Sequence, residues 1–360
     1  MKGLRQFFPG ARRNRGKSGA QAVNDAGERS QQHEPGVENA GKDDKGMQPF
    51  SVAGVQMHVS AHHSNVETMR QQLQVLVHQF PWVDMVLFSE LAPFGPLPTN
   101  APEDTAAVEA EFRDMAREHG IWLIPGSMFM VVDGHRYNES MVIDPNGEVV
   151  GRYRKMFPFM PYEQGVEPGH EFLVFDVPGV GRFGLTICYD LWFPETTRTL
   201  AAMGAEVILA PTLTNTIDRE IELSIAKAMA AVNQCYVIDV NGVGNGGYGK
   251  SIFVGPQGHV LHQSGAGPEV VPLQLNLDRV RWERDNGIHG LGQVLKSFRD
   301  RRVDFPVYNP ETFDNSYLDS LGPIRKPTRW RTPTAADARD GTYADPAQQP
   351  PTSISGSGSL

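Results

Sequence analysis

Three ionisable side chains in this sequence each stand where a predicted β-strand ends. Glu90 closes the run VDMVLFSE, Lys155 follows VVGRYR, and Cys188 closes FGLTIC. In α/β proteins, ligands bind at the carboxyl ends of the strands, so a carboxylate, an amine and a thiol placed there can meet in one pocket. Such a set can carry out nucleophilic catalysis, because a thiol attacks a carbonyl carbon once a neighbouring base removes its proton.

Each of these residues also has an ordinary interpretation. A cysteine after an apolar strand is most often a small core residue, and a lone glutamate or lysine often caps a turn or lies in solvent. The combination favours a functional role, because a carboxylate after a buried strand is costly unless a partner offsets its charge. Lys155 supplies that partner for Glu90. Cys235 has no matching acid–base neighbours and is expected in the core.

The surrounding sequence alternates between strand and helix patterns. Short apolar runs predict strands at 50–57, 83–88, 121–125, 172–177, 183–187, 207–210 and 236–240. Helical spacing and end signals predict helices that begin near Ser64, run from about Asp104 to His119, and fall near 195–203 and 219–234. This alternation in both halves of the chain indicates an α/β protein whose sheets are covered by helices.

Three motifs carry a resemblance to a known family. FSELAPFG contains Glu90, RYRKMFPF contains Lys155, and TICYDLWFPE contains Cys188. With these motifs in this order, the chain resembles the nitrilase superfamily of carbon–nitrogen hydrolases over about residues 48–276. Its MFPFMPYEQ loop lies nearest the aliphatic amidase and formamidase branches. The resemblance implies a four-layer α-β-β-α sandwich that usually forms homo-oligomers, and a reaction that needs no metal or organic cofactor.

The chemistry of amide hydrolysis gives the conserved-type motifs definite roles. Cys188 is expected to attack the amide carbon while Glu90 takes its proton. Lys155 and the backbone N–H of Tyr189 are the expected donors to the oxyanion. The resemblance implies that Glu163, eight residues beyond Lys155, is a second glutamate that helps to orient the substrate and the catalytic groups.

Aromatic side chains close to these motifs are expected to wall the pocket. Phe159 and Tyr162 share the loop of Glu163, and Trp192 follows the cysteine. Glu195 begins a predicted helix after Pro194, where it is expected to cap that helix and brace the cysteine loop rather than react.

Two further patterns resemble binding sites but are not interpreted as such. GVGNGG at 242–247 matches G-x-G-x-x-G, yet a strand and a turn are predicted after it, where a dinucleotide site requires a helix. His58, His62 and His63 lie in a predicted loop, and no nearby residue completes an ordered ligand set. We therefore expect neither a nucleotide cofactor nor a metal.

The predicted reaction is hydrolysis of a small carboxamide to a carboxylic acid and ammonia through a thioester acyl-enzyme. Tyr189 and Asp190 follow the cysteine, where nitrilases proper typically carry Trp-Glu. An N-carbamoyl amidohydrolase is the first alternative, and a nitrilase the second. An inactive family member that serves as a binding scaffold is the alternative of a different class, although the intact Glu90, Lys155 and Cys188 argue against it.

Composition limits the partners and the location of the protein. The formal net charge of −9 opposes binding to nucleic acid, whose phosphates repel an acidic chain. No apolar run approaches the roughly 20 residues that a membrane-spanning helix needs. Two cysteines in 360 residues form no disulfide framework and suit a reducing, cytoplasmic setting. A small-molecule amide is therefore the expected partner.

The composition also divides the chain into four parts. Residues 1–46 begin with a basic stretch that lacks acidic residues and are expected to form a disordered tail rather than a targeting signal. Residues 47–277 are the predicted carbon–nitrogen hydrolase domain. Residues 278–330 are a C-terminal extension that is expected to pack on a partner subunit, and 331–360 are a second disordered tail.

Overall fold

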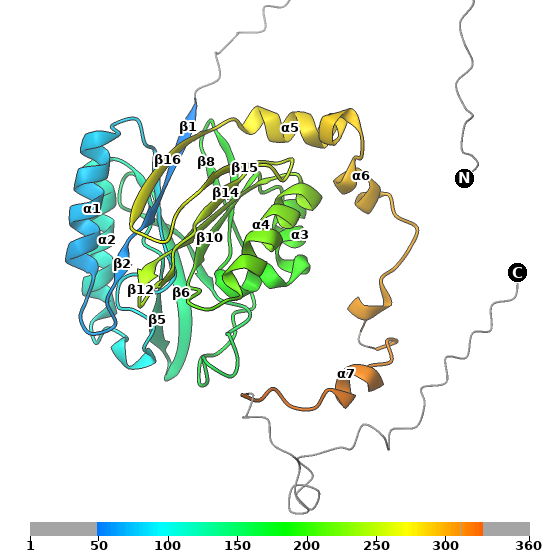
Figure 1. Ribbon diagram of the computed structural model, residues 1–360, viewed down its shortest axis with the longest axis horizontal. Coiled ribbons are helices and arrows are strands. Elements are labelled where there is room, and N and C mark those ends of the chain that lie inside the picture. The colour runs from blue at the N-terminus through cyan, green and yellow to red at the C-terminus, as the bar shows by residue number, and fades with distance from the viewer. Residues whose placement is uncertain (1–48, 310, 327–360) are drawn as a thin grey trace, which may run out of the picture. The chain divides into compact units, whose positions relative to one another are not determined.

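The computed structural model describes residues 49–309 and 311–326 (Figure 1). The two predicted tails, 1–46 and 331–360, lie outside the described residues.

Among the described residues, seven strands form the first sheet. Its order is β16-β1-β3-β4-β6-β5, and β7 pairs with β6. β1, β3 and β4 run parallel, which brings their carboxyl ends to one edge of the sheet. The strands are β1 (Phe50–Gln56), β3 (Met85–Phe88), β4 (Trp122–Ile124), β5 (Ser127–Val132), β6 (His135–Ile143), β7 (Val149–Arg154) and β16 (Glu269–Leu275).

The described chain forms a second sheet of six strands in the order β15-β14-β11-β10-β9-β8. Its parallel centre consists of β9, β10 and β11. The strands are β8 (Leu173–Val177), β9 (Gly181–Leu185), β10 (Val207–Thr212), β11 (Tyr236–Asn241), β14 (Ile252–Val254) and β15 (Val260–Gln263). A small third sheet contains β2 (His58–Val59), β12 (Val243–Gly244) and β13 (Gly247–Tyr248).

Helices cover the outer face of each large sheet. α1 and α2 lie on the first sheet, and α3 and α4 lie on the second (Figure 1). The helices are α1 (Val66–Gln79), α2 (Thr105–His119), α3 (Pro194–Ala202), α4 (Arg219–Asn233), α5 (Leu277–Asn286), α6 (Val294–Arg299) and α7 (Ser316–Ser320). Short 3-10 turns are η1 (Pro98–Asn100), η2 (Cys188–Trp192), η3 (Ile288–Gly290) and η4 (Pro306–Tyr308).

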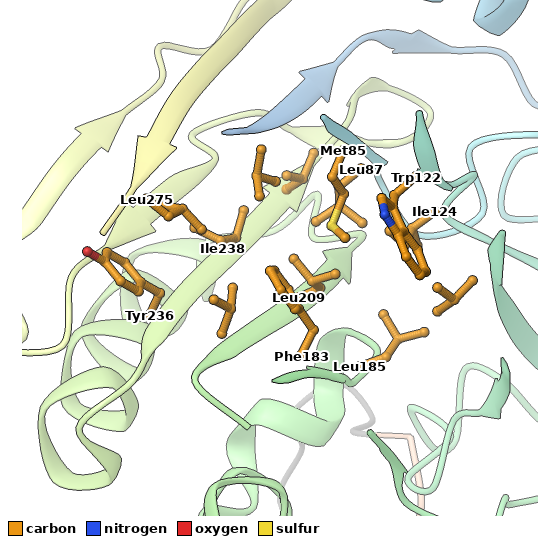
Figure 2. Packing of buried hydrophobic residues seen from close by; sticks show 14 of the residues in the cluster. Met85, Leu87, Trp122, Ile124, Phe183, Leu185, Leu209, Tyr236, Ile238 and Leu275 are labelled. Atoms are coloured by element: carbon orange, nitrogen blue, oxygen red, sulfur yellow. The ribbon is translucent and has the colours of Figure 1, made fainter. Parts of the chain in front are cut away.

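The inner faces of the two sheets pack against each other and form the central core. Figure 2 shows Met85, Leu87 and Trp122 of the first sheet opposite Phe183 and Leu209 of the second. Side chains alternate between faces along each strand, because successive residues of a β-strand point to opposite sides. The predicted four-layer α-β-β-α sandwich is therefore confirmed.

The alternation is visible in single strands. Val52 of β1 joins the core between the sheets, whereas Ala53 and Val55 pack under α1 and α2. In β10, Leu209 joins the central core and Ile208 packs under α4. Both sheets are thus buried on both faces, which explains why their strands are almost continuously apolar.

The C-terminal boundary of the sandwich differs from the prediction. Leu277 and Val280 of α5 belong to the central core, so the sandwich continues past the boundary predicted after residue 277. The sequence suggested a break there because strand and helix alternation ends, whereas the structure adds one more packed helix. Beyond α5, residues 288–326 carry many exposed apolar side chains, including Leu291, Tyr317 and Ile324.

Candidate active site

The ends of three strands bring the predicted residues together. Glu90 lies just beyond β3, Lys155 directly follows β7, and Cys188 begins η2 beyond β9. Together with Glu163, they line one cavity of about 550 Å³. Glu90 and Lys155 are each only 2% exposed, so both are almost completely removed from water. One cavity therefore contains a thiol, an ammonium and two carboxylates.

Lys155 lies between the two carboxylates. Its Nζ donates to Glu90 Oε1 at 2.8 Å and to Glu163 Oε2 at 2.7 Å. Burial alone would lower the pKa of Lys155, but the charges of Glu90 and Glu163 outweigh it and hold the pKa well above its ordinary value. Burial raises the pKa of Glu90, and the Lys155 charge opposes that rise. The lysine is thus an ammonium at neutral pH.

Asn138 in β6 is a site residue that sequence reasoning missed. Its Nδ2 donates to Glu90 Oε1 at 2.8 Å and to Glu163 Oε1 at 3.1 Å. The backbone N–H of Lys155 in turn donates to Asn138 O at 2.9 Å. Asn138 therefore connects both carboxylates and fixes the start of the lysine segment. It stands within the run RYNESMVI, where no sequence signal marks one polar residue above its neighbours.

Cys188 has an unusual backbone conformation. Its φ of 46° lies in the left-handed region, which L-residues rarely adopt. Such a conformation costs about 1–3 kcal/mol and tends to occur at functional sites. Cys188 Sγ lies 3.5 Å from Leu213 O and 4.0 Å from Thr214 Oγ1. Burial raises the pKa of the thiol well above its ordinary value, and the Glu90 charge adds to this effect while Lys155 opposes it.

Asp190 holds the turn that carries the cysteine. Its Oδ2 accepts from Tyr153 Oη at 2.7 Å and from the N–H of Ile187 at 3.1 Å, and its Oδ1 accepts from the N–H of Phe157 at 2.9 Å. The side chain thus links η2 to the lysine segment. Burial raises the pKa of Asp190 to about 6, although these hydrogen bonds oppose the rise. Sequence reasoning used Asp190 only to compare branches and missed this positioning role.

The predicted aromatic wall is present in part. Phe159 and Tyr162 line the cavity and stack with ring centroids 5.2 Å apart, and Tyr189 meets Phe159 at 5.0 Å. Trp192 is not among the lining residues, so its assignment to the wall was wrong. It lies behind the cavity wall, where its Nε1 donates to Glu222 Oε1 at 3.2 Å.

The helix after the cysteine turn is held differently from the prediction for Glu195. The exposed Glu195 carboxylate accepts from Tyr308 Oη of the C-terminal extension at 2.8 Å. Thr196 braces the cysteine turn, because its Oγ1 donates to Asp190 O at 2.7 Å and to Phe193 O at 2.8 Å.

The two patterns rejected as binding sites have structural roles. Residues 242–247 contribute to the paired strands β12 and β13 and are followed by β14, with no helix after the glycines. Cys235 is fully buried under α4, and burial raises its pKa to about 12. Across 49–309 and 311–326, no group of three His, Cys, Asp or Glu could hold a metal ion. No helix in this part of the chain is long and apolar enough to cross a membrane.

The family profile of carbon–nitrogen hydrolases matches residues 51–284, which is well over half of the chain. The chain belongs to this family. The match spans both large sheets and reaches into α5, in agreement with the packing of that helix. This carbon–nitrogen hydrolase is also a member of the nitrilase superfamily, as its motifs indicated.

Individual relatives of this carbon–nitrogen hydrolase are amidases. It is 32% identical to the deaminated glutathione amidase of Dictyostelium discoideum over 196 residues, which cover 49% of this chain and 67% of the relative. It is 29% identical to the formamidase of Pseudomonas syringae over 227 residues, 59% of this chain and 67% of the relative. A solved amidase from Nesterenkonia sp. AN1 superposes with a TM-score of 0.61 at 25% identity and covers 70% of this chain and 94% of that structure.

Proposed function

We propose that this protein hydrolyses small carboxamides to carboxylic acids and ammonia through a thioester on Cys188. The observation that carries the proposal is the contact of Lys155 Nζ with Glu90 Oε1 at 2.8 Å in the cavity that also contains the cysteine. A solved relative, the Nesterenkonia amidase, has an active-site cysteine to which the acetamide moiety of fluoroacetamide adds covalently.

In the first half-reaction, Glu90 acts as the general base. Lys155 and Asn138 both donate to Oε1 of Glu90, which leaves Oε2 to accept the proton of the Cys188 thiol. The sulfur then bonds to the amide carbon, and the carbonyl oxygen becomes an oxyanion. The protonated Glu90 next gives its proton to the nitrogen as the carbon–nitrogen bond breaks and ammonia leaves.

Lys155 and the backbone N–H of Tyr189 stabilise the oxyanion. An ammonium has three donors, and two of those on Lys155 are engaged by Glu90 and Glu163, so one remains for the substrate oxygen. The left-handed conformation of Cys188 sets the direction of the peptide that follows it. Loss of one such donor typically lowers the rate by about 10²–10³.

In the second half-reaction, water hydrolyses the thioester. Glu90 takes a proton from water as its oxygen attacks the carbonyl carbon, and the carbon–sulfur bond breaks to release the acid. The proton returns to Cys188, which restores the thiol. One carboxylate thus serves both steps. Asn138 and Glu163 keep Glu90 and Lys155 in place throughout, because they bind the same groups from the opposite side.

An ammonia assay tests this function. Wild-type protein is incubated with valeramide, an N-carbamoyl amino acid and valeronitrile, together with Cys188→Ala and Cys235→Ala variants. We expect ammonia from valeramide with the wild type and the Cys235 variant, and none with the Cys188 variant. Hydroxylamine should divert part of the acyl group to a hydroxamate, because it attacks thioesters in competition with water.

Three results would contradict the proposal. Equal activity of Cys188→Ala would exclude the thioester. Activity confined to the N-carbamoyl compound or to the nitrile would support the corresponding alternative reaction. Absence of all activity in a wild-type protein whose Cys188 also resists iodoacetamide would favour an inactive scaffold.

A further inference from the structure

The wall of the cavity around the start of α4 carries negative charge. This α4 wall, defined here as residues 213–218 and Glu222, contributes Asp218 and Glu222 to the cavity lining. The two side chains are four residues apart and therefore lie on the same face of the helix start. Glu90 and Glu163 are the other acidic groups that line the cavity, and among the described lining residues Lys155 is the one cation.

Lys155 does not neutralise the α4 wall. Its Nζ is already engaged by Glu90 at 2.8 Å and by Glu163 at 2.7 Å, so its charge is balanced at the reacting end of the cavity. Arg219 lies next to the wall but is only 2% exposed and is not a lining residue. Its guanidinium binds both oxygens of Asp239, at 3.0 and 3.1 Å, as well as Glu222.

One acceptor position on Glu222 remains open toward the cavity. Oε2 accepts from Thr214 Oγ1 at 2.6 Å and from Arg219 Nη1 at 3.1 Å, and Oε1 accepts from Trp192 Nε1 at 3.2 Å. A carboxylate offers about four acceptor positions, so Oε1 can receive one more N–H. Asp218 binds Thr216 Oγ1 through Oδ1, which leaves acceptor capacity on that carboxylate as well.

Two features nearby favour negative charge and must be weighed against the wall. The N-terminus of α4 is positive because of the helix dipole, equivalent to about half a charge. Asp218 and the acidic first-turn residues Glu220 and Glu222 exceed that half charge. Lys326 Nζ lies 5.5 Å from the ring centroid of Tyr162, but Lys326 is not a lining residue. The balance at the wall is therefore negative.

We infer that the cavity selects amides that carry a positively charged amino group at the end remote from the scissile bond, and discriminates against amides that carry a carboxylate there. This inference rests on the proposed amidase function and adds the substrate class. An ammonium would find the open acceptors of Asp218 and Glu222, whereas a carboxylate would face both charges without a cation on the wall. The cavity of about 550 Å³ has room for such a side chain, because known small-ligand sites begin at about 300 Å³.

Three amides of nearly equal size test the inference. γ-Aminobutyramide is cationic, valeramide is neutral and succinamate is anionic. We expect kcat/KM to fall in that order, with at least about a tenfold difference between the cation and the anion, since two partly screened charges suffice for such a factor. Asp218→Asn should lower the ratio of kcat/KM for γ-aminobutyramide to that for valeramide by about threefold to tenfold. Glu222→Gln should act in the same direction.

The matched control is Glu220→Gln. Glu220 lies in the same helical turn but pairs with Lys250 outside the cavity, so this variant should keep the wild-type ratio. Succinamate turned over as well as γ-aminobutyramide would overturn the inference and leave the amidase function intact. A preference for succinamate that Lys326→Ala removes would also overturn it, because Lys326 would then be the partner of the remote group. Failure to hydrolyse any of the three amides would refute the proposed function itself.

Discussion

Replacing Lys155 by methionine is the most direct test of the buried charge arrangement. Methionine keeps much of the length of the side chain but removes the ammonium, so Glu90 and Glu163 lose the cation that lies within 2.8 Å of each. Both carboxylates stay in the cavity wall, where Glu90 is 2% exposed. The substitution therefore creates two neighbouring acidic groups without a shared partner.

The expected cost depends on pH. Removing one partner of a buried ion pair typically destabilises a protein by about 3–5 kcal/mol. Part of this cost is avoided when a carboxylate takes up a proton, so the pKa of Glu90, already raised by burial, rises further without Lys155. A carboxyl group with a folded-state pKa above its unfolded value of about 4.3 binds its proton more tightly when folded. The free energy of unfolding then decreases as the pH rises through the interval between the two pKa values.

Urea denaturation of wild type and Lys155→Met at about pH 5 and about pH 8 measures both effects. We expect the variant to lose more free energy of unfolding at the higher pH. The double variant Lys155→Met/Glu163→Gln is the control, because it removes one of the two uncompensated charges and should recover part of the loss. A loss below about 1 kcal/mol at both pH values, with no recovery in the double variant, would refute the buried ion-pair arrangement.

Three further predictions address positioning, pH and assembly. Asn138→Leu removes the donor to both carboxylates, so kcat should fall about tenfold to a hundredfold with a smaller change in KM; a change confined to KM would contradict the positioning role. Since burial raises the pKa of Asp190 to about 6, its ionisation should lower the free energy of unfolding by about 3 kcal/mol between about pH 4 and pH 6. Asp190→Asn should flatten that slope in urea denaturation, and an unchanged slope would exclude the assignment. A chain that ends at Gly287 should form a smaller species in sedimentation, because we propose that the exposed apolar residues of 288–326 pack on a second copy; an unchanged size would refute this.

The helices and strands of the sandwich were largely predictable because local signals and tertiary packing agree. α2 is the clearest case: the side chain of Asp104 accepts from the N–H of Ala107 at 2.9 Å, and Gly120 ends the helix with φ of 63°, as the sequence indicated. α5 was missed because its outer face is strongly charged and only Leu277 and Val280 contribute to the central core.

The site was predictable where function requires a particular residue type at the end of a strand. Glu90, Lys155 and Cys188 meet this condition, and the structure places them in one cavity. Asn138 could not be found from the sequence, because its contacts depend on the pairing of β6 with β7. Trp192 was misassigned because the 3-10 turn after the cysteine carries its side chain toward Glu222 instead of the cavity.

The charges of the site favour a thiol that is activated only when a substrate is bound. Burial raises the pKa of Cys188 well above its ordinary value and raises that of Glu90 as well, so the resting protein holds a neutral thiol beside a carboxylate. A permanent thiolate would add a further negative charge next to Glu90 in a buried position. Transfer of the thiol proton to Glu90 instead coincides with the appearance of negative charge on the substrate oxygen, which Lys155 can stabilise. Because charge moves from one partner of Lys155 to another, the reaction needs little rearrangement of the cavity.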